Sequence, residues 1–142
     1  MYLKEGYDDA AVKDICYHCG SPTAKKSYNY FRRIAYVSQG KVWSKVWSKV
    51  WYADDTPIAF YYATRARNHL RLIEIAVREE YQGRGIGAMV LREILRDMHI
   101  FGVHKLTFRT PSNEKAPGFW QHMGARIMDV KGQDYEMELT IK

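Results

Sequence analysis

The chain has 142 residues and a mass of 16.7 kDa, and 46% of the residues are hydrophobic while 27% are charged. This length predicts a single domain over residues 1–142, and the composition excludes disordered and fibrous proteins. The longest apolar run, Ile58 to Ala63, excludes a membrane-spanning helix, and a net charge of +6 favours anionic partners.

The N-terminal residues lack the charged-then-apolar pattern of a signal peptide, so we expect a cytoplasmic protein. Two cysteines, Cys16 and Cys19, are consistent with a reducing compartment. A zinc site would need two more ligands at matching spacing, and the other histidines are scattered. We therefore interpret both cysteines as ordinary buried residues and expect no metal site.

The first third of the chain predicts a short strand and two helices. Residues 1–5 form the strand, and Asp8 is a helix-start signal before an apolar run that Gly20 and Pro22 stop. A second helix is predicted over Thr23–Ser38. Its apolar residues recur at helical spacing: Tyr30, Ile34 and Val37.

A four-residue repeat follows, Lys-Val-Trp-Ser, which runs almost three times through residues 41–51. As a strand it places its tryptophans on one face and its valines on the other, whereas as a helix it stacks the tryptophans. The β-forming residues, the turn at Asp54-Asp55 and the run Ile58–Thr64 favour a hairpin. The tryptophan face either packs under a helix or forms an exposed aromatic patch for an acceptor or a second subunit, which would make a homodimer.

The strand predicted over Leu70–Val77 changes its apolar parity between Leu72 and Ile73, as a β-bulge would produce. After a turn rich in glycine, a helix with an apolar stripe ends at Gly102. The remaining elements are a strand, a short helix and a strand pair: Lys105–Thr110, Lys115–Met123, Arg126–Val130 and Tyr135–Ile141.

The strongest functional signal is the glycine turn that opens this helix. Glycines at 83, 85 and 87 leave backbone N–H groups uncovered at a helix N-terminus, which favours a phosphate, and Arg78 and Arg84 add cations within reach. The turn is not a Walker A loop, because Ala88 and Met89 follow Gly87. A dinucleotide site is a weak match, because five residues separate the strand from the turn and the next strand ends without an acid.

The turn Gln82-Gly-Arg-Gly-Ile-Gly87 after the bent strand resembles the Gln/Arg-x-x-Gly-x-Gly/Ala motif of the GCN5-related N-acetyltransferases, the GNAT family. A second landmark of the family, Asn-x-x-Ala followed by an aromatic pair and a glycine, resembles residues 113–124. The resemblance is specific over residues 70–124. It implies an α/β (α+β) fold with a mixed, mainly antiparallel sheet, a splayed central strand pair and helices on both faces.

The resemblance also implies acetyl-coenzyme A (acetyl-CoA) as the acetyl donor. Its pantetheine arm would pair like an extra strand with the splayed strand, its pyrophosphate would lie on the glycine turn, and Asn113 would contact it or order the loop beside it. The implied cofactor-binding residues are Ile75, Ala76, Val77, Gln82, Gly83, Arg84, Gly85, Ile86, Gly87, Ala88 and Asn113.

Acetyl transfer to an amine needs a base, a donor for the developing oxyanion and an acid for the leaving thiolate. Glu74 is the candidate base, directly or through a water, because it lies on the splayed strand and faces away from Ile73 and Ile75; the alternative is an ordinary strand acid. The backbone N–H of Val77 is the expected oxyanion donor.

The general acid is where this chain departs from the family, because Trp120 stands where a tyrosine is common and its indole N–H is no acid near neutral pH. His122 and Tyr135 are conceivable acids, although a structural role suits each better. The sequence therefore predicts an N-acetyltransferase with a primary amine of unknown identity as acceptor. A non-catalytic acetyl-CoA-binding module and, last, a nucleic-acid-binding protein are the alternatives.

Overall fold

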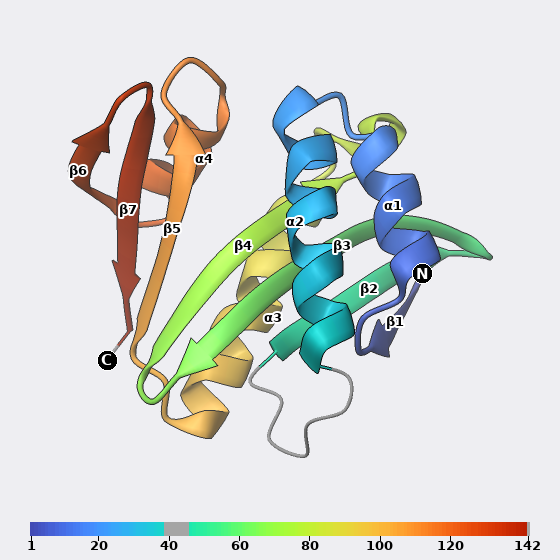
Figure 1. Cartoon of the computed structure of the whole chain (residues 1–142), viewed down its shortest axis with the longest axis horizontal. Coiled ribbons are helices and arrows are strands. Elements are labelled where there is room, and N and C mark those ends of the chain that lie inside the picture. The colour runs from blue at the N-terminus through green and yellow to red at the C-terminus, as the bar shows by residue number, and fades with distance from the viewer. Residues whose placement is uncertain (39–45, 142) are drawn as a thin grey trace.

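The computed structural model describes residues 1–38 and 46–141. Its strands form one seven-stranded sheet in the order β1-β2-β3-β4-β5-β7-β6 (Figure 1). The strands are β1 (Tyr2–Glu5), β2 (Val46–Ala53), β3 (Thr56–Ala66), β4 (His69–Val77), β5 (Lys105–Pro111), β6 (Arg126–Lys131) and β7 (Asp134–Thr140). The helices are α1 (Asp9–Tyr17), α2 (Pro22–Ser38), the short 3-10 helix η1 (Glu79–Tyr81), α3 (Ile86–Phe101) and α4 (Ala116–His122).

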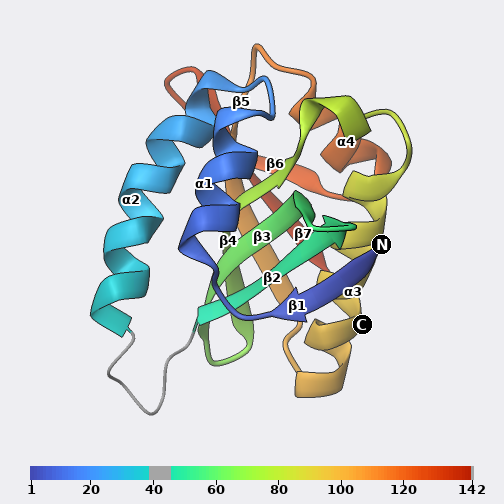
Figure 2. The ribbon, with the colours of Figure 1, turned by 90° about the vertical axis from the view of Figure 1, so that its right-hand side faces the viewer.

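Helices cover both faces of the sheet (Figure 2). Helices α1 and α2 pack on one face over a cluster that contains Ile15, Tyr28 and Phe60. Helix α3 packs on the other face, where Val90, Leu91 and other buried residues of its predicted apolar stripe meet the sheet. All strand pairs are antiparallel except β4 with β5. The predicted mixed, mainly antiparallel sheet is confirmed. No helix in the described part of the chain has the length and hydropathy needed to cross a membrane.

The predicted hairpin is confirmed as β2 and β3, with Val46 paired to Thr64. Residues 41–45 of the repeat, which include Trp43, lie outside the described residues. Trp51 is buried on the α3 face, and the ring of Trp47 lies 5.6 Å from that of Phe101 at the end of α3. Of the two interpretations, packing under a helix is therefore correct for these two tryptophans, and the exposed patch is wrong for them.

Helix α2 confirms the predicted helix but not its predicted buried side chain. Tyr30 is 58% exposed, whereas Tyr28 is 2% exposed and donates a hydrogen bond to the carboxylate of Asp9 on α1. The side chains of Ile34 and Val37 lie outside those that the structure describes. Packing against α1 thus decides which tyrosine of α2 is buried.

The predicted bulge in β4 is confirmed. Tyr62 pairs with Glu74 and the next residue of β3, Ala63, pairs with Leu72, so Ile73 is the extra residue. Ile73 packs against the cluster under α1 and α2, which is also the side that Glu74 faces. The expectation that Glu74 points away from Ile73 is therefore wrong, because the bulge places both on one side.

The central strands splay apart as predicted. Pairing between β4 and β5 runs from His69 with Lys105 to Arg71 with Thr107 and then stops. Beyond this point the two strands diverge (Figure 1). β5 continues its pairing with β7 on its other side as far as Pro111, so the edges of β4 and β5 that face each other are both unpaired here.

Candidate active site

The open edge of β4 offers backbone groups to a ligand. The N–H of Arg78 donates to the carbonyl oxygen of Ile58 in β3 at 2.7 Å. Because successive N–H groups in a strand point to opposite sides, those of Ile75 and Val77 point away from β3 and toward the gap beside β5. An extended ligand with amide groups can pair with this edge, as another strand would.

The turn after β4 leads into α3 through two glycines in the left-handed region. Gly83 has φ +75° and Gly85, the N-cap of α3, has φ +79°, and Gly85 supplies no side chain to cap the helix. An added Cβ at either glycine would meet no atom within 4 Å, so backbone strain rather than crowding favours glycine. The first N–H groups of this 16-residue helix therefore remain available to an anion.

The cations near the turn have different surroundings. Arg78 is buried, forms an ion pair with Asp14 and donates from Nε to the carbonyl oxygen of Pro57 at 3.1 Å. The expectation that Arg78 reaches a bound phosphate is wrong, because its side chain is used to attach β4 to α1. Arg84 is exposed beside the turn, with its guanidinium 5.2 Å from the ring centre of Tyr81.

Gln82 joins the glycine turn to two other segments. Its side-chain Nε2 donates to the carbonyl oxygen of Cys19 at 2.7 Å and to that of Val77 at 2.8 Å. The N–H of Glu79 also donates to the carbonyl oxygen of His18 at 2.7 Å. These bonds hold the loop between α1 and α2 against the end of β4.

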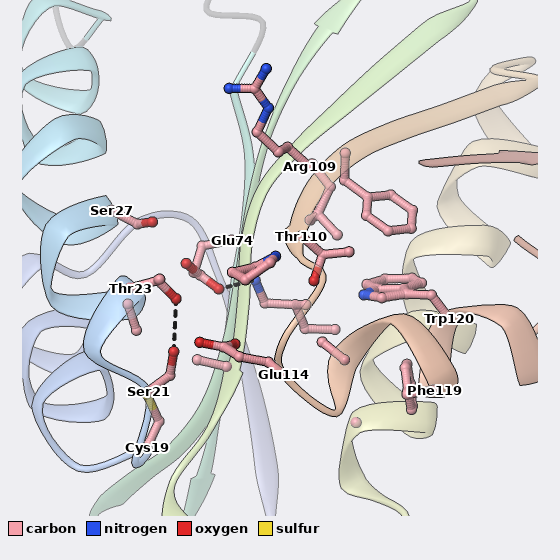
Figure 3. Close-up of a pocket in the computed structure, with 18 of the residues that line it drawn as sticks. Cys19, Ser21, Thr23, Ser27, Glu74, Arg109, Thr110, Glu114, Phe119 and Trp120 are labelled. Atoms are coloured by element: carbon pink, nitrogen blue, oxygen red, sulfur yellow. Dashed lines mark hydrogen bonds between the residues drawn. The ribbon is translucent and has the colours of Figure 1, made fainter. Parts of the chain in front are cut away.

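A cavity of about 570 Å³ opens between the splayed strands (Figure 3). Six of the predicted site residues line it: Glu74, Ile75, Ala76, Val77, Gln82 and Gly87. Others lie outside the lining, namely Gly83, Arg84, Gly85, Ile86, Ala88 and Asn113. Ile86 is buried in the core under α3, and Asn113 is exposed in the turn after β5. Their contacts with a cofactor stay predictions.

Glu74 lies half-buried in the cavity wall. Burial raises the pKa of its carboxyl from 4.5 to about 7. Hydrogen bonds with Ser27 and with the N–H of Ile75 lower the pKa, but burial has the larger effect. The negative charge of Glu114 contributes to this rise of the pKa. A carboxyl with this pKa is divided between its two protonation states near neutral pH, as a general base should be.

The aromatic residues of the predicted Asn-x-x-Ala segment form one wall of the cavity. Trp120 is 3% exposed, and its ring centre lies 4.0 Å from that of Phe108 in a tilted contact and 5.3 Å from that of Phe119 in an edge-to-face contact. Trp120 is therefore packed among aromatic rings in this wall. His122 is exposed on α4 and Tyr135 packs against the core, and neither lines the cavity.

Sequence analysis missed the polar wall opposite. Ser21 in the loop before α2 and Thr23 and Ser27 in α2 line the cavity, and the hydroxyls of Ser21 and Thr23 share a hydrogen bond of 2.8 Å. Glu114, on the loop between β5 and α4, was also missed. The sequence signal that could have identified Glu114 was its position inside the Asn-x-x-Ala segment.

Both cysteines are buried with free thiols, and burial raises the pKa of each. Cys19 lines the cavity beside Ser21. Within the described part of the chain, no three His, Cys, Asp or Glu side chains are grouped to hold a metal ion.

Comparison with known proteins places these features in a family. The model of the acetyltransferase (GNAT) family matches residues 15–125. No curated protein matches the chain. Among solved structures, PaiA N-acetyltransferase from Thermoplasma acidophilum in complex with coenzyme A is 18% identical with a TM-score of 0.80, and the match covers 99% of this chain and 100% of that one.

Two more solved structures share the fold. The ribosomal-protein-S18-alanine N-acetyltransferase from Escherichia coli is 18% identical, with a TM-score of 0.77 and coverage of 99% of this chain and 93% of that one. An acetyltransferase from Bacillus subtilis in complex with CoA is 14% identical, with a TM-score of 0.73 and coverage of 99% and 98%. At these identities the likeness concerns the fold.

Proposed function

The chain belongs to the GNAT family of acetyltransferases, and we propose that it transfers the acetyl group of acetyl-CoA to a primary amine by direct attack within a ternary complex. The observation that carries this proposal is the open edge of β4, which leads from the base candidate Glu74 to the glycine turn. Enzymes of this family are acyltransferases, so the proposal concerns the acceptor and the mechanism.

The residues present fit acetyl-CoA at both ends. The N–H groups of Ile75 and Val77 point into the gap, where an amide group of a pantetheine arm can pair with that of Ile75 and that of Val77 stays free for the acetyl oxygen. The free N–H groups at the start of α3 suit the pyrophosphate. When bound, acetyl-CoA would supply an acetyl thioester beside the cavity.

Glu74 accepts the proton that the amine loses. The amine nitrogen forms a bond to the acetyl carbonyl carbon, the carbon–sulfur bond breaks, and the electron pair leaves with the thiolate sulfur. The N–H of Val77 stabilises the negative charge that develops on the carbonyl oxygen. Trp120 does not protonate the thiolate, so the thiolate leaves unassisted and takes its proton from water.

A thiol-release assay tests the proposal. Acetyl-CoA is offered with a panel of small amines, peptide N-termini and polyamines, and the acetylated product is identified by mass spectrometry. We expect turnover with at least one primary amine. Binding of CoA, seen as a thermal shift, without turnover on any amine would instead favour a non-catalytic acetyl-CoA-binding module.

A further inference from the structure

The cavity beside Glu74 has two chemically different walls (Figure 3). Aromatic rings of Phe119 and Trp120 form one wall, and the hydroxyls of α2 and the loop before it form the other. Glu74 and Glu114 lie between the two walls and both line the cavity. A ligand in this space therefore meets two carboxyl groups.

The two carboxyl groups are not paired with cationic side chains of the protein. In residues 1–38 and 46–141, neither Glu74 nor Glu114 forms an ion pair. Arg109 also lines the cavity, but its side chain points away from both glutamates in Figure 3 and its Nε lies 3.9 Å from Asp134. Lys115 also lines the cavity but is exposed. With Asp134, the lining holds three carboxyl groups and two cationic side chains, so carboxyl groups are in excess.

We propose that Glu114 binds a second ammonium group of the acceptor, which is a compact aliphatic diamine or polyamine whose first amine reacts beside Glu74. This inference rests on the proposed function. A monoamine would leave the carboxylate of Glu114 without a counter-charge, whereas a diamine places one nitrogen at each glutamate. The hydroxyl oxygens of Ser21, Thr23 and Ser27 can together accept hydrogen bonds from the two ammonium groups.

Glu114 acts in this proposal as a positioning residue, because it contacts the end of the acceptor that does not react. It should therefore affect the KM of diamines and leave kcat almost unchanged. A purely structural role for Glu114 would instead alter diamines and monoamines alike. The distinction requires two acceptors of equal length that differ in one charge.

Putrescine and butylamine are such a pair, since both have four carbons and butylamine lacks the second amine. We measure the acetylation of each by the wild type and by Glu114→Gln. We expect kcat/KM to favour putrescine by about 10- to 100-fold in the wild type, the range of a lost charge-assisted hydrogen bond. In Glu114→Gln this preference should disappear through a higher KM for putrescine. Asp129→Asn, an equal change of charge on exposed β6, is the control and should keep the preference.

Calorimetry of the CoA-bound protein gives a readout that does not need turnover. Putrescine should bind more tightly than butylamine, and Glu114→Gln should abolish the difference. Equal kcat/KM for the two amines, or better turnover of a peptide N-terminus, would overturn this inference while the proposed acetyltransfer stands. If no amine is acetylated and calorimetry shows no preference for putrescine, both proposals fail.

Discussion

The backbone N–H of Ile75 donates a hydrogen bond to Oε1 of Glu74 at 3.2 Å. One end of this bond is the proposed base, and the other is a group that we expect to pair with the pantetheine arm. The dashed line between them in Figure 3 marks this contact. Binding of the arm therefore competes with the carboxyl group of Glu74 for the same N–H.

This competition predicts that bound CoA raises the pKa of Glu74. The hydrogen bond from Ile75 favours the ionised carboxyl, so its loss makes the carboxyl more basic than its value of about 7 in the free protein. A carboxyl-carbon NMR titration with and without CoA measures the change, with Glu74→Gln to assign the signal. The nucleotide half of CoA, which lacks the arm, should leave the pKa lower than whole CoA does. Equal titrations with both ligands would contradict the competition.

Replacement of the proposed base should slow the reaction while leaving binding intact. Glu74→Gln keeps the shape of the side chain and removes its basicity, so we expect kcat to fall by about 10²–10⁴ with an unchanged CoA thermal shift. The rate of the variant should rise more steeply with pH than that of the wild type, since it depends on amines that are already deprotonated. Full activity at neutral pH would place the base elsewhere.

The same substitution should stabilise the fold at high pH. Burial raises the pKa of Glu74 from 4.5 to about 7 in the folded protein, so between these values the folded state binds more protons than the unfolded state. Stability from this group is therefore present at low pH and is lost as the pH rises toward 7. We expect Glu74→Gln to raise the free energy of unfolding by ~1–3 kcal/mol at about pH 8. Near about pH 4 the two proteins should be equal in denaturant titrations.

The glycine turn can be tested with a matched pair of glycines. Gly85 has φ +79° at the start of α3, and Gly132 has φ +64° in the turn between β6 and β7. Valine at either position should lower the free energy of unfolding by about 1–2 kcal/mol through left-handed strain. Only Gly85→Val should lose the CoA thermal shift, because its side chain occupies the space of the pyrophosphate. An equal CoA shift in both variants would remove the turn from the site.

Trp120 should matter for packing more than for proton transfer. Trp120→Phe keeps an aromatic ring against Phe108, so we expect the free energy of unfolding to fall by about 1–2 kcal/mol. Its kcat should stay within about threefold of the wild type, because the indole N–H does not protonate the thiolate. A loss of kcat of about 100-fold at unchanged CoA binding would assign a catalytic role to that N–H.

Local sequence signals determined most of the elements and the location of the candidate site. The parity change after Leu72 predicts the bulge, and the glycines from 83 to 87 predict a turn before a helix, because both patterns act over a few residues. These two features lie next to each other in the chain. The sequence alone therefore located the bent strand and the glycine turn that we propose binds the pyrophosphate.

Only the tertiary structure decided which distant residues meet there. Arg78 and Asp14 are 64 positions apart, and their ion pair removes Arg78 from the predicted phosphate site. The hydroxyls of α2 and the carboxyl of Glu114 line the cavity with Glu74 because α2 packs over β4 and the β5–α4 loop turns back toward it. Burial there also raises the pKa of Glu74, and burial arises from packing between elements that no local pattern encodes.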